Sequence, residues 1–279
     1  MIIDTHTHFY DPSRPQGVPW PGQDSELYRT VLPEHARELA EPEGVTGTVV
    51  VEASAWIDDN QWILDLAAED PFIVGLVGHI DPDRPEFSAE LDRYADNPQF
   101  VGIRCGTGPF GDIEAGSFLA DMELLASKEL ELDVLVGKDL LGNVTRLARR
   151  LPEMRVVINH VASVRIDGEA ADPEWVDAIN AAAECPSVYM KVSGFMESSA
   201  VQPAPAEVDF YRPVFDAMWE AFGEDRLVFG SNWPVSERAG DYKRCVDIVK
   251  AYFGEKGESA SEKYFYSNSK TAYRWPDPA

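Results

Sequence analysis

The sequence predicts a single (β/α)8 barrel that spans residues 1–279. Eight short apolar, β-branched runs alternate with segments of helical periodicity, which indicates parallel strands joined by helices. The runs are apolar at successive positions, as expected for a sheet that is buried on both faces. A doubly wound open sheet is the main alternative. It would usually carry a glycine-rich phosphate turn after the first strand, where this chain has a His-x-His pair.

The expected elements follow one another in regular order. We expect the strands at Met1–Thr5, Gly47–Ala53, Phe72–Ile80, Phe100–Arg104, Leu132–Val136, Val156–His160, Val188–Val192 and Leu227–Gly230. Helical spacing joins three sets of apolar residues: Leu140, Val144, Leu147 and Leu151; Val214, Met218 and Phe222; Tyr242, Val246, Val249 and Phe253. Pro33 suits the first turn of a helix that runs to about Ala40, and Pro173, directly after Asp172, suits another helix start. No linker or internal repeat divides the chain, so one domain is expected.

Composition and charge limit the possible partners. The chain is 44% hydrophobic and 11% aromatic, which is enough to fill a core. Its 24 Lys+Arg against 49 Asp+Glu give a net charge of -25, which opposes binding to nucleic acid or to anionic membranes. A small-molecule substrate is therefore expected, and a homo-oligomer stays open.

The cysteines and the N-terminus point to the compartment. Three cysteines, none in a C-x-x-C spacing, argue against a disulfide framework and against a cysteine zinc site. No basic region followed by an apolar one opens the chain, and no apolar run reaches membrane-spanning length. We expect a cytoplasmic enzyme.

The longest predicted loops all follow strands. They are Phe9–Thr30, Cys105–Gly111, Ser163–Asp172 and Gly194–Ala206. The connections that lead from a helix back to a strand are shorter. Active sites of (β/α)8 barrels lie at the face built from strand-to-helix loops, so this bias predicts a site there.

Polar side chains end the apolar strands at that same face. His6 and His8 point to one side of the first strand because side chains alternate along a strand. Of the five histidines, only His35 falls outside the strand ends. The strand-end residues, in chain order, are His6, His8, Glu52, His79, Arg104, His160, Lys191, Ser193, Ser231 and Asn232. Glu52 and Lys191 could instead belong to buried ion pairs that hold the barrel together.

Several motifs resemble those of a known family when taken as an ordered set. They are Asp4-Thr-His-Thr-His8, Gly102-Ile-Arg104, Val157-Ile-Asn-His160, Tyr189-Met-Lys-Val-Ser-Gly194, Phe229-Gly-Ser-Asn-Trp-Pro-Val235 and the tail from Tyr266 to Trp275. Over essentially the whole chain they resemble the amidohydrolase superfamily. The similarity is to its amidohydrolase-related branch, which includes sugar lactonases and 2-pyrone-4,6-dicarboxylate lactonase. The resemblance implies a distorted (β/α)8 barrel.

The same resemblance suggests roles for the site residues. His6, His8 and His160 match the family's histidines, and Arg104 matches an arginine that can hold a substrate carboxylate or carbonyl. Asn232 stands where the family's hydrolases usually have aspartate. An asparagine amide is neutral, cannot act as a base near pH 7 and is a poor zinc ligand. It can still orient a water or donate to an oxyanion.

Two expectations follow for the chemistry. No cofactor is required, or one divalent metal such as zinc binds weakly to His6, His8 and His160. The general base is then a histidine, with His160, His8 and His79 as candidates.

We therefore predict a hydrolase that opens the ring of a small lactone. Catalysis is assigned to His6, His8, His160 and Asn232, and substrate contact to Arg104, His79, Glu52 and Lys191. A sugar lactone and a carboxylated cyclic ester both fit a single strand-end arginine. The alternatives are a metal-dependent decarboxylase, a hydrolase of an amide or phosphoester, and an altered barrel that only binds a small acid.

Overall fold

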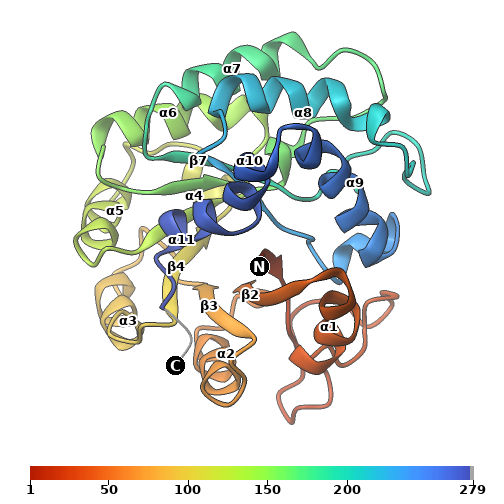
Figure 1. Ribbon diagram of the computed structural model, residues 1–279. Coiled ribbons are helices and arrows are strands. Elements are labelled where there is room, and N and C mark those ends of the chain that lie inside the picture. The colour runs from red at the N-terminus through yellow and green to blue at the C-terminus, as the bar shows by residue number, and fades with distance from the viewer. Residues whose placement is uncertain (277–279) are drawn as a thin grey trace.

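The computed structural model describes residues 1–276, which fold into eight parallel strands surrounded by helices (Figure 1). Each strand pairs in parallel with the next along the chain, in the order β1 to β8. The strands are β1 (Ile2–Thr7), β2 (Val45–Val51), β3 (Ile73–Gly78), β4 (Phe100–Cys105), β5 (Glu131–Val134), β6 (Val156–Ile158), β7 (Val188–Val192) and β8 (Leu227–Phe229). The predicted (β/α)8 architecture is confirmed, and every predicted strand overlaps an observed one.

The barrel is nearly closed, because β1 and β8 meet without a regular ladder. One parallel bridge joins Thr7 to Trp233, and the amide N–H of His8 donates to the Trp233 carbonyl at 2.9 Å. A side chain strengthens the seam, since Asp4 Oδ1 accepts the Ser231 amide N–H at 2.8 Å. This seam brings the ends of β1 and β8 together at one edge of the barrel mouth.

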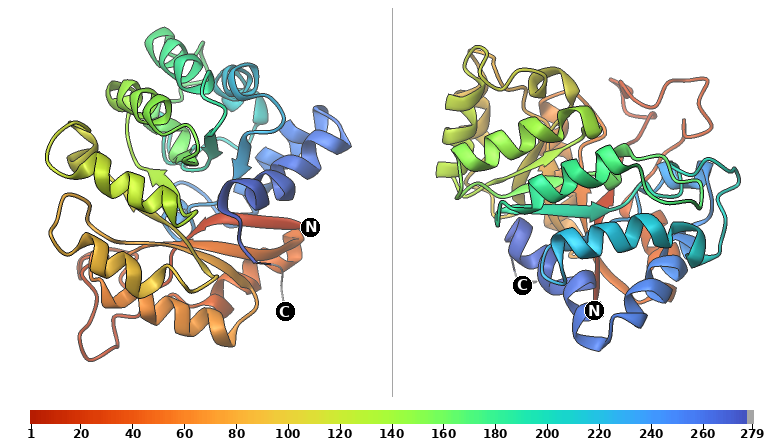
Figure 2. Two further views of the ribbon diagram at one scale, coloured as in Figure 1. Left: turned by 90° about the vertical axis from the view of Figure 1, so that its left-hand side faces the viewer. Right: turned by 90° about the horizontal axis from the view of Figure 1, so that it is seen from above.

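Helices follow the strands, and most of them form the outer layer, while the last of them lies across one end of the barrel (Figures 1 and 2). They are α1 (Pro33–Ala40), α2 (Asp58–Glu69), α3 (Phe87–Tyr94), α4 (Thr107–Phe110), α5 (Phe118–Ser127), α6 (Leu141–Arg150), α7 (Pro173–Ala183), α8 (Val208–Phe222), α9 (Tyr242–Glu255), α10 (Glu258–Glu262) and α11 (Asn268–Tyr273). The start predicted at Pro173 is confirmed. Asp172 caps α7, because its carboxylate accepts the amide N–H groups of Glu174 and Trp175.

Some predicted strand ends are wrong by two residues. β6 stops at Ile158 and β3 at Gly78, short of the expected His160 and Ile80. After β6, the four residues from His160 to Ser163 have φ between 47° and 56°. This left-handed run cannot continue a strand, so the chain turns sharply and His160 leaves the sheet.

Two apolar layers hold the molecule together. The larger layer lies between the strands and the helices. The smaller fills the barrel interior and continues into α11 and the residues after it; its buried members are Ile3, Val49, Val51, Val74, Val77, Val101, Val157, Tyr189, Val228, Ala272, Tyr273 and Trp275. The C-terminal segment thus seals the end of the barrel where the strands begin. The segment after β1 extends at the opposite end, away from the N-terminus (Figure 2, right).

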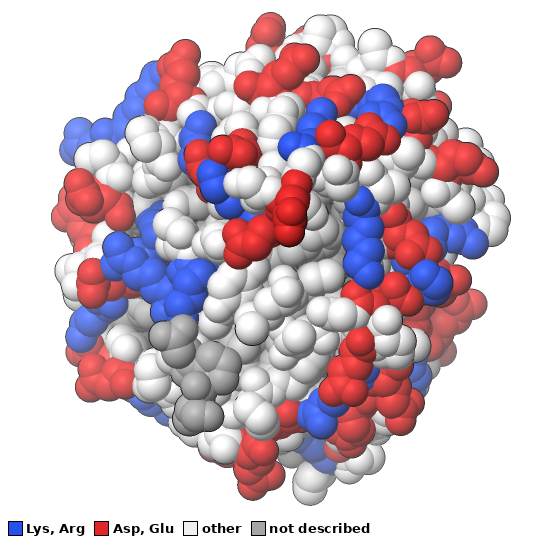
Figure 3. Space-filling model, in the orientation of Figure 1, with Lys and Arg blue, Asp and Glu red and all other residues white. Residues whose placement is uncertain are grey.

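The charge surplus is spread over the surface. Acidic side chains surround the face seen in Figure 3, with basic ones interspersed among them. No helix within residues 1–276 is long and apolar enough to cross a membrane.

Candidate active site

A cavity of about 330 Å³ opens among the carboxyl ends of the strands. Its walls come from β1, β2, β4 and from the segments that follow β6 and β8. The lining residues are His8, Trp20, Glu52, Ala53, Arg104, His160, Asn232 and Val235. The strand-end residues of the first, second, fourth, sixth and eighth strands therefore meet in one place.

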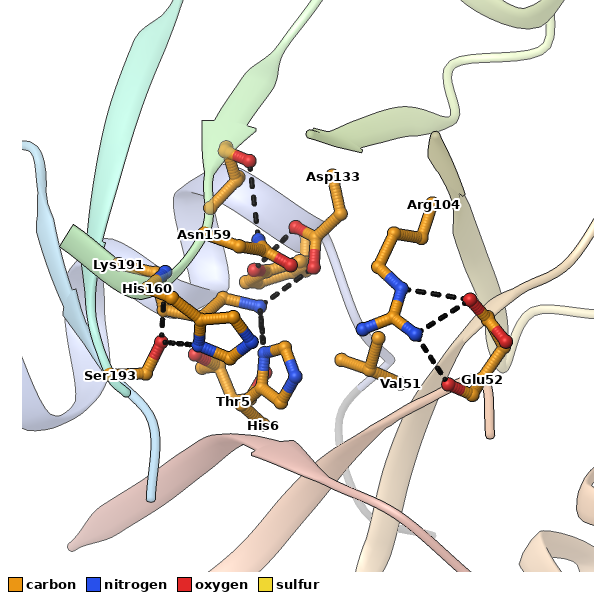
Figure 4. A network of polar contacts seen from close by, with 12 residues as sticks. Thr5, His6, Val51, Glu52, Arg104, Asp133, Asn159, His160, Lys191 and Ser193 are labelled. Carbon is orange, nitrogen blue, oxygen red and sulfur yellow. Dashed lines mark hydrogen bonds and ion pairs between the residues drawn. The ribbon is translucent and has the colours of Figure 1, made fainter. Parts of the chain in front are cut away.

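Three imidazoles form the centre of this cluster. The ring of His6 lies 4.9 Å from that of His8 and 4.4 Å from that of His160, measured between ring centroids. His6 is fully buried beneath the cavity, while His8 and His160 line it. Figure 4 shows the rings of His6 and His160 next to each other, tilted by 52°.

Two glycines make room for these rings. A Cβ atom at Gly230 would lie 2.8 Å from His6 Cβ, and one at Gly194 would lie 2.8 Å from His160 Cβ. Contacts that short do not occur in folded proteins, so a larger residue would displace the imidazoles. His160 and Asn232 themselves adopt φ of 51° and 60°. Left-handed backbone at non-glycine residues costs free energy and is concentrated at functional sites.

The tautomer of His8 follows from its partner. Its Nδ1 lies 2.9 Å from the Val51 carbonyl oxygen, which can only accept, so Nδ1 carries the proton. Nε2 of the neutral ring then holds a lone pair. It lies 3.3 Å from Asn232 Oδ1, another acceptor. A water that donates one hydrogen to each atom would satisfy both.

Lys191 lies behind the histidines and is fully buried. Its ammonium group contacts Asp133 Oδ2 at 2.7 Å, the Thr5 carbonyl oxygen at 2.9 Å and His6 Nδ1 at 3.3 Å (Figure 4). The ion pair with Asp133 keeps its three N–H donors directed at these three acceptors. Because His6 Nδ1 accepts a hydrogen bond, the proton of the neutral ring sits on Nε2.

Arg104 is bound by Glu52 across the neighbouring strands. Its Nε and Nη2 lie 2.8 and 2.7 Å from Glu52 Oε1, and Nη2 also donates to the Glu52 carbonyl at 3.0 Å. The remaining guanidinium nitrogen points toward the histidines (Figure 4). The pair is about 15% exposed, so the cavity has an arginine whose charge is balanced.

Burial and neighbouring cations keep the imidazoles neutral. Desolvation, with Arg104 second, lowers the pKa of His8 to about 3. Desolvation also lowers the pKa of His6 and His160 well below the usual value, with Lys191 as the next cause for His6 and Arg104 for His160. The three neutral rings can donate and accept hydrogen bonds, but they are weak bases.

A carboxylate lies next to Asn232. Glu197, in the loop between β7 and α8, accepts a hydrogen bond from Asn232 Nδ2 at 2.6 Å. Desolvation raises the pKa of Glu197 to about 7, although the hydrogen bond from Asn232 opposes the shift.

Three of the predicted site residues do not line the cavity: His6 lies beneath it, and His79 and Lys191 lie farther away. His79 follows the end of β3 and lines a separate hollow with Trp56 and Asp81. The hydrogen bonds of its backbone with the Asn60 side chain hold it there. Lys191 is enclosed behind His6. It forms a buried ion pair with Asp133, which is the second of the two roles that the sequence left open for it.

Two residues of the site escaped the sequence reasoning. Trp20 lines the cavity, and its ring lies 5.9 Å from that of His8. Glu197 contacts Asn232. Both belong to strand-to-helix loops that the sequence marks as long, and no feature of those loops singles these residues out.

A tightly held metal does not fit these residues. The buried Nε2 of His6, which has no protein partner, carries the ring proton and offers no lone pair. Histidines that bind a metal donate their other N–H to an oxygen acceptor, whereas His6 Nδ1 faces an ammonium group. Within the described part of the chain, no group of three His, Cys, Asp or Glu residues is arranged to hold a metal ion.

Comparisons with known proteins identify the family of the chain. A family model described as amidohydrolase matches residues 3–275. A curated L-fucono-1,5-lactonase from Burkholderia ambifaria is 31% identical over 99% of this chain and 97% of its own length.

Two solved structures share the fold. One is an amidohydrolase from Burkholderia multivorans with bound zinc, which is 24% identical, with coverage of 99% of this chain and 100% of that one and a TM-score of 0.85. The other is a probable 2-pyrone-4,6-dicarboxylic acid hydrolase from Acinetobacter baumannii with bound citric acid. It is 18% identical, with coverage of 98% of this chain and 99% of that one and a TM-score of 0.75.

Proposed function

Because this chain belongs to the amidohydrolase family, we propose that it hydrolyses the ring ester bond of a small, uncharged sugar lactone. The family model spans nearly the whole chain. The relative from Burkholderia ambifaria, which is 31% identical, is named L-fucono-1,5-lactonase. A sugar 1,5-lactone of that kind is the first substrate to test.

The charge balance of the cavity is the observation that carries the proposal. Glu52 neutralises Arg104, and the histidines that line the cavity have lowered pKa values and are uncharged. A carboxylated lactone would lose its hydration without gaining an unpaired cation. A neutral polyol loses less hydration free energy when it enters the cavity. Its hydroxyl groups can form hydrogen bonds with the acceptors and donors along the walls.

Hydrogen-bonding groups supply the rest of the chemistry. The free guanidinium nitrogen of Arg104 would donate to the lactone carbonyl and to the oxyanion that forms on it. His8 Nε2 and Asn232 Oδ1, 3.3 Å apart, would hold the attacking water. His160 would hydrogen-bond a substrate hydroxyl, and the His6 ring would support it from beneath. A lactone needs less activation than an amide, which suits such a site.

We further propose that the reaction proceeds without a bound metal. The support is the donor set. His6 Nε2 is protonated because Lys191 donates to Nδ1, and Asn232 replaces the carboxylate that would balance a divalent charge. Zinc in the similar solved structure makes metal content a necessary measurement.

The experiment is a panel of lactones monitored by acid release with a pH indicator. We expect turnover of sugar 1,5-lactones, and we expect His160→Ala and Asn232→Ala to lose at least about 100-fold in kcat/KM. Carbon dioxide release from aromatic carboxylic acids would instead identify a decarboxylase. Binding of sugar acids without turnover of any lactone would identify a binding protein.

A further inference from the structure

The residues that line the cavity include one carboxylate, Glu52, which is bound to Arg104, so the proposed reaction needs another proton acceptor. Asn232 is neutral and cannot act as a base. The histidines hold lone pairs, but burial and nearby cations oppose their protonation. A general base works best when its pKa lies near the working pH. An ionisable group beside the water position is therefore needed.

Glu197 is placed to supply this group. Its Oε1 is held by Asn232 Nδ2 at 2.6 Å, and Asn232 lines the cavity. The backbone N–H of Glu197 itself also approaches the carboxylate, and Oε2 is not one of the fully enclosed unpaired atoms among residues 1–276. Asn232 thus fixes one oxygen of Glu197, which leaves Oε2 as the oxygen that could receive a proton.

We propose that Glu197 is the general base of the lactone hydrolysis, and that Asn232 orients it by holding one of its carboxylate oxygens. The inference rests on the proposed function. The amide at position 232 and the carboxylate at position 197 would together replace the single aspartate that the family resemblance leads one to expect at the end of β8. In this proposal the carboxylate is supplied by position 197, which contacts position 232, instead of by position 232 itself.

The proton balance of the step is simple. The attacking water keeps one hydrogen on His8 Nε2 and turns the other from Asn232 Oδ1 toward Glu197 Oε2. The water oxygen forms a bond to the lactone carbonyl carbon, the carbonyl π electrons move to the carbonyl oxygen, and that second proton passes to Glu197 Oε2, directly or through one further water. The tetrahedral oxyanion then collapses, the bond from carbon to ring oxygen breaks, and Glu197 returns the proton to the ring oxygen. The product is a hydroxy acid, which ionises and releases a proton to solvent.

The surroundings of Glu197 suit this exchange. Packing against α8 and α9 desolvates its carboxyl group and raises its pKa to about 7, near the range where a base is most effective. The titratable side chains that approach it from those helices are Tyr211 and Cys245. Burial raises the pKa of both, so both are neutral. Asn232 is the side chain that hydrogen-bonds the carboxylate, and the backbone N–H of Glu197 is a further donor.

Moving the carboxylate tests the proposal. Glu197→Gln keeps the shape and can still accept from Asn232 Nδ2, but it cannot take a proton. We expect it to lower kcat by at least about 100-fold, with KM within a few-fold and with the limb near pH 7 lost from the pH profile of kcat. The double variant E197Q/N232D returns a carboxylate to the pair and should recover at least tenfold of the lost rate. Glu184→Gln, on the surface beside Arg149, is the matched control and should leave the rate unchanged.

Two results would overturn the proposal. One is an E197Q protein that keeps its rate and pH profile. The other is an inactive, folded E197Q whose rate the double variant does not restore, since Glu197 would then act through structure alone. Failure of the proposed function is separable, because the wild-type protein would then open no lactone. In that case carbon-13 NMR of the Glu197 carboxyl decides. Titration near pH 7 together with the Asn232 amide signals supports the pair, and an ordinary midpoint near 4.5 contradicts it.

Discussion

The ammonium nitrogen of Lys191 lies 3.3 Å from Nδ1 of His6, inside the barrel and out of reach of solvent. This contact distinguishes the site from a metal centre, where the corresponding nitrogen donates to an oxygen. It places the ring proton on Nε2 and a positive charge directly behind the histidine cluster. The mouth of this barrel therefore favours hydrogen bonding to a neutral ligand over coordination of a cation.

Metal content follows from that contact. Protein purified without a chelator should contain far less than one zinc per chain, and treatment with a chelator should leave its lactonase rate unchanged. Elemental analysis by mass spectrometry and the acid-release assay measure the two quantities. Stoichiometric zinc whose removal abolishes turnover, and whose return restores it, would contradict the assigned tautomer of His6.

Lys191→Met should destabilise the fold strongly. The variant leaves Asp133 buried without its cationic partner, and breaking a buried ion pair in this way costs about 3–5 kcal/mol. Urea denaturation would measure the free energy of unfolding. Lys138→Met is the matched control, because it breaks the exposed pair with Asp172 and should cost less than about 1 kcal/mol. Equal losses in the two variants would argue against a buried charge pair.

Acid should destabilise the protein through its histidines. The pKa of His8 falls to about 3 in the folded chain, and those of His6 and His160 also fall well below 6.5. Depressed pKa values contribute stability that is fully present above pH 6.5 and is lost as the pH falls, because the unfolded chain binds the extra protons.

The size of this effect can be measured by urea denaturation between pH 7.5 and 5. Three such groups give a slope of up to about 4 kcal/mol per pH unit below pH 6. His160→Asn should flatten the slope by about a third. His35→Asn, on the exposed face of α1, should leave it unchanged. A slope that no histidine substitution alters would assign the acid sensitivity to other groups.

Glu52 should control which lactones are accepted. Glu52→Gln removes the charge that balances Arg104, so a carboxylated lactone gains an unpaired guanidinium. We expect its kcat/KM relative to that of a neutral sugar lactone to rise about tenfold, which corresponds to about 1.4 kcal/mol. Glu114→Gln, which affects an exposed pair with Arg146, should not change the ratio. An unchanged ratio in Glu52→Gln would mean that Arg104 does not face the ring substituents.

The strands could be predicted from the sequence because they are continuous apolar runs between polar loops. The predicted strand ends were wrong where the backbone leaves the extended conformation of a strand. The left-handed run from His160 to Ser163 has no sequence signature, since valine and alanine are not residues that favour positive φ. The sealing of the barrel by α11 depends on long-range packing of Tyr273 and Trp275, which periodicity along the chain does not report.

The site was predictable to the extent that strand ends determine it. Side chains at the ends of parallel strands must meet, so His8, Arg104, His160 and Asn232 were found. From the sequence, His79 could not be told apart from the histidines of the cavity, because the Asn60 side chain that holds its backbone lies far from it along the chain. Glu197 lies five residues beyond its strand, in a loop whose path no local pattern specifies. Reasoning from strand ends does not find a charged side chain that a loop contributes to the site.

Initial rates of acid release from L-fucono-1,5-lactone and related sugar 1,5-lactones, with metal-free protein, test the central claim most directly. The account predicts turnover that saturates with substrate, falls at least about 100-fold in His160→Ala and Asn232→Ala, and is unaffected by added chelator. Absence of turnover for every lactone in the panel, from protein that is folded by circular dichroism, would contradict it.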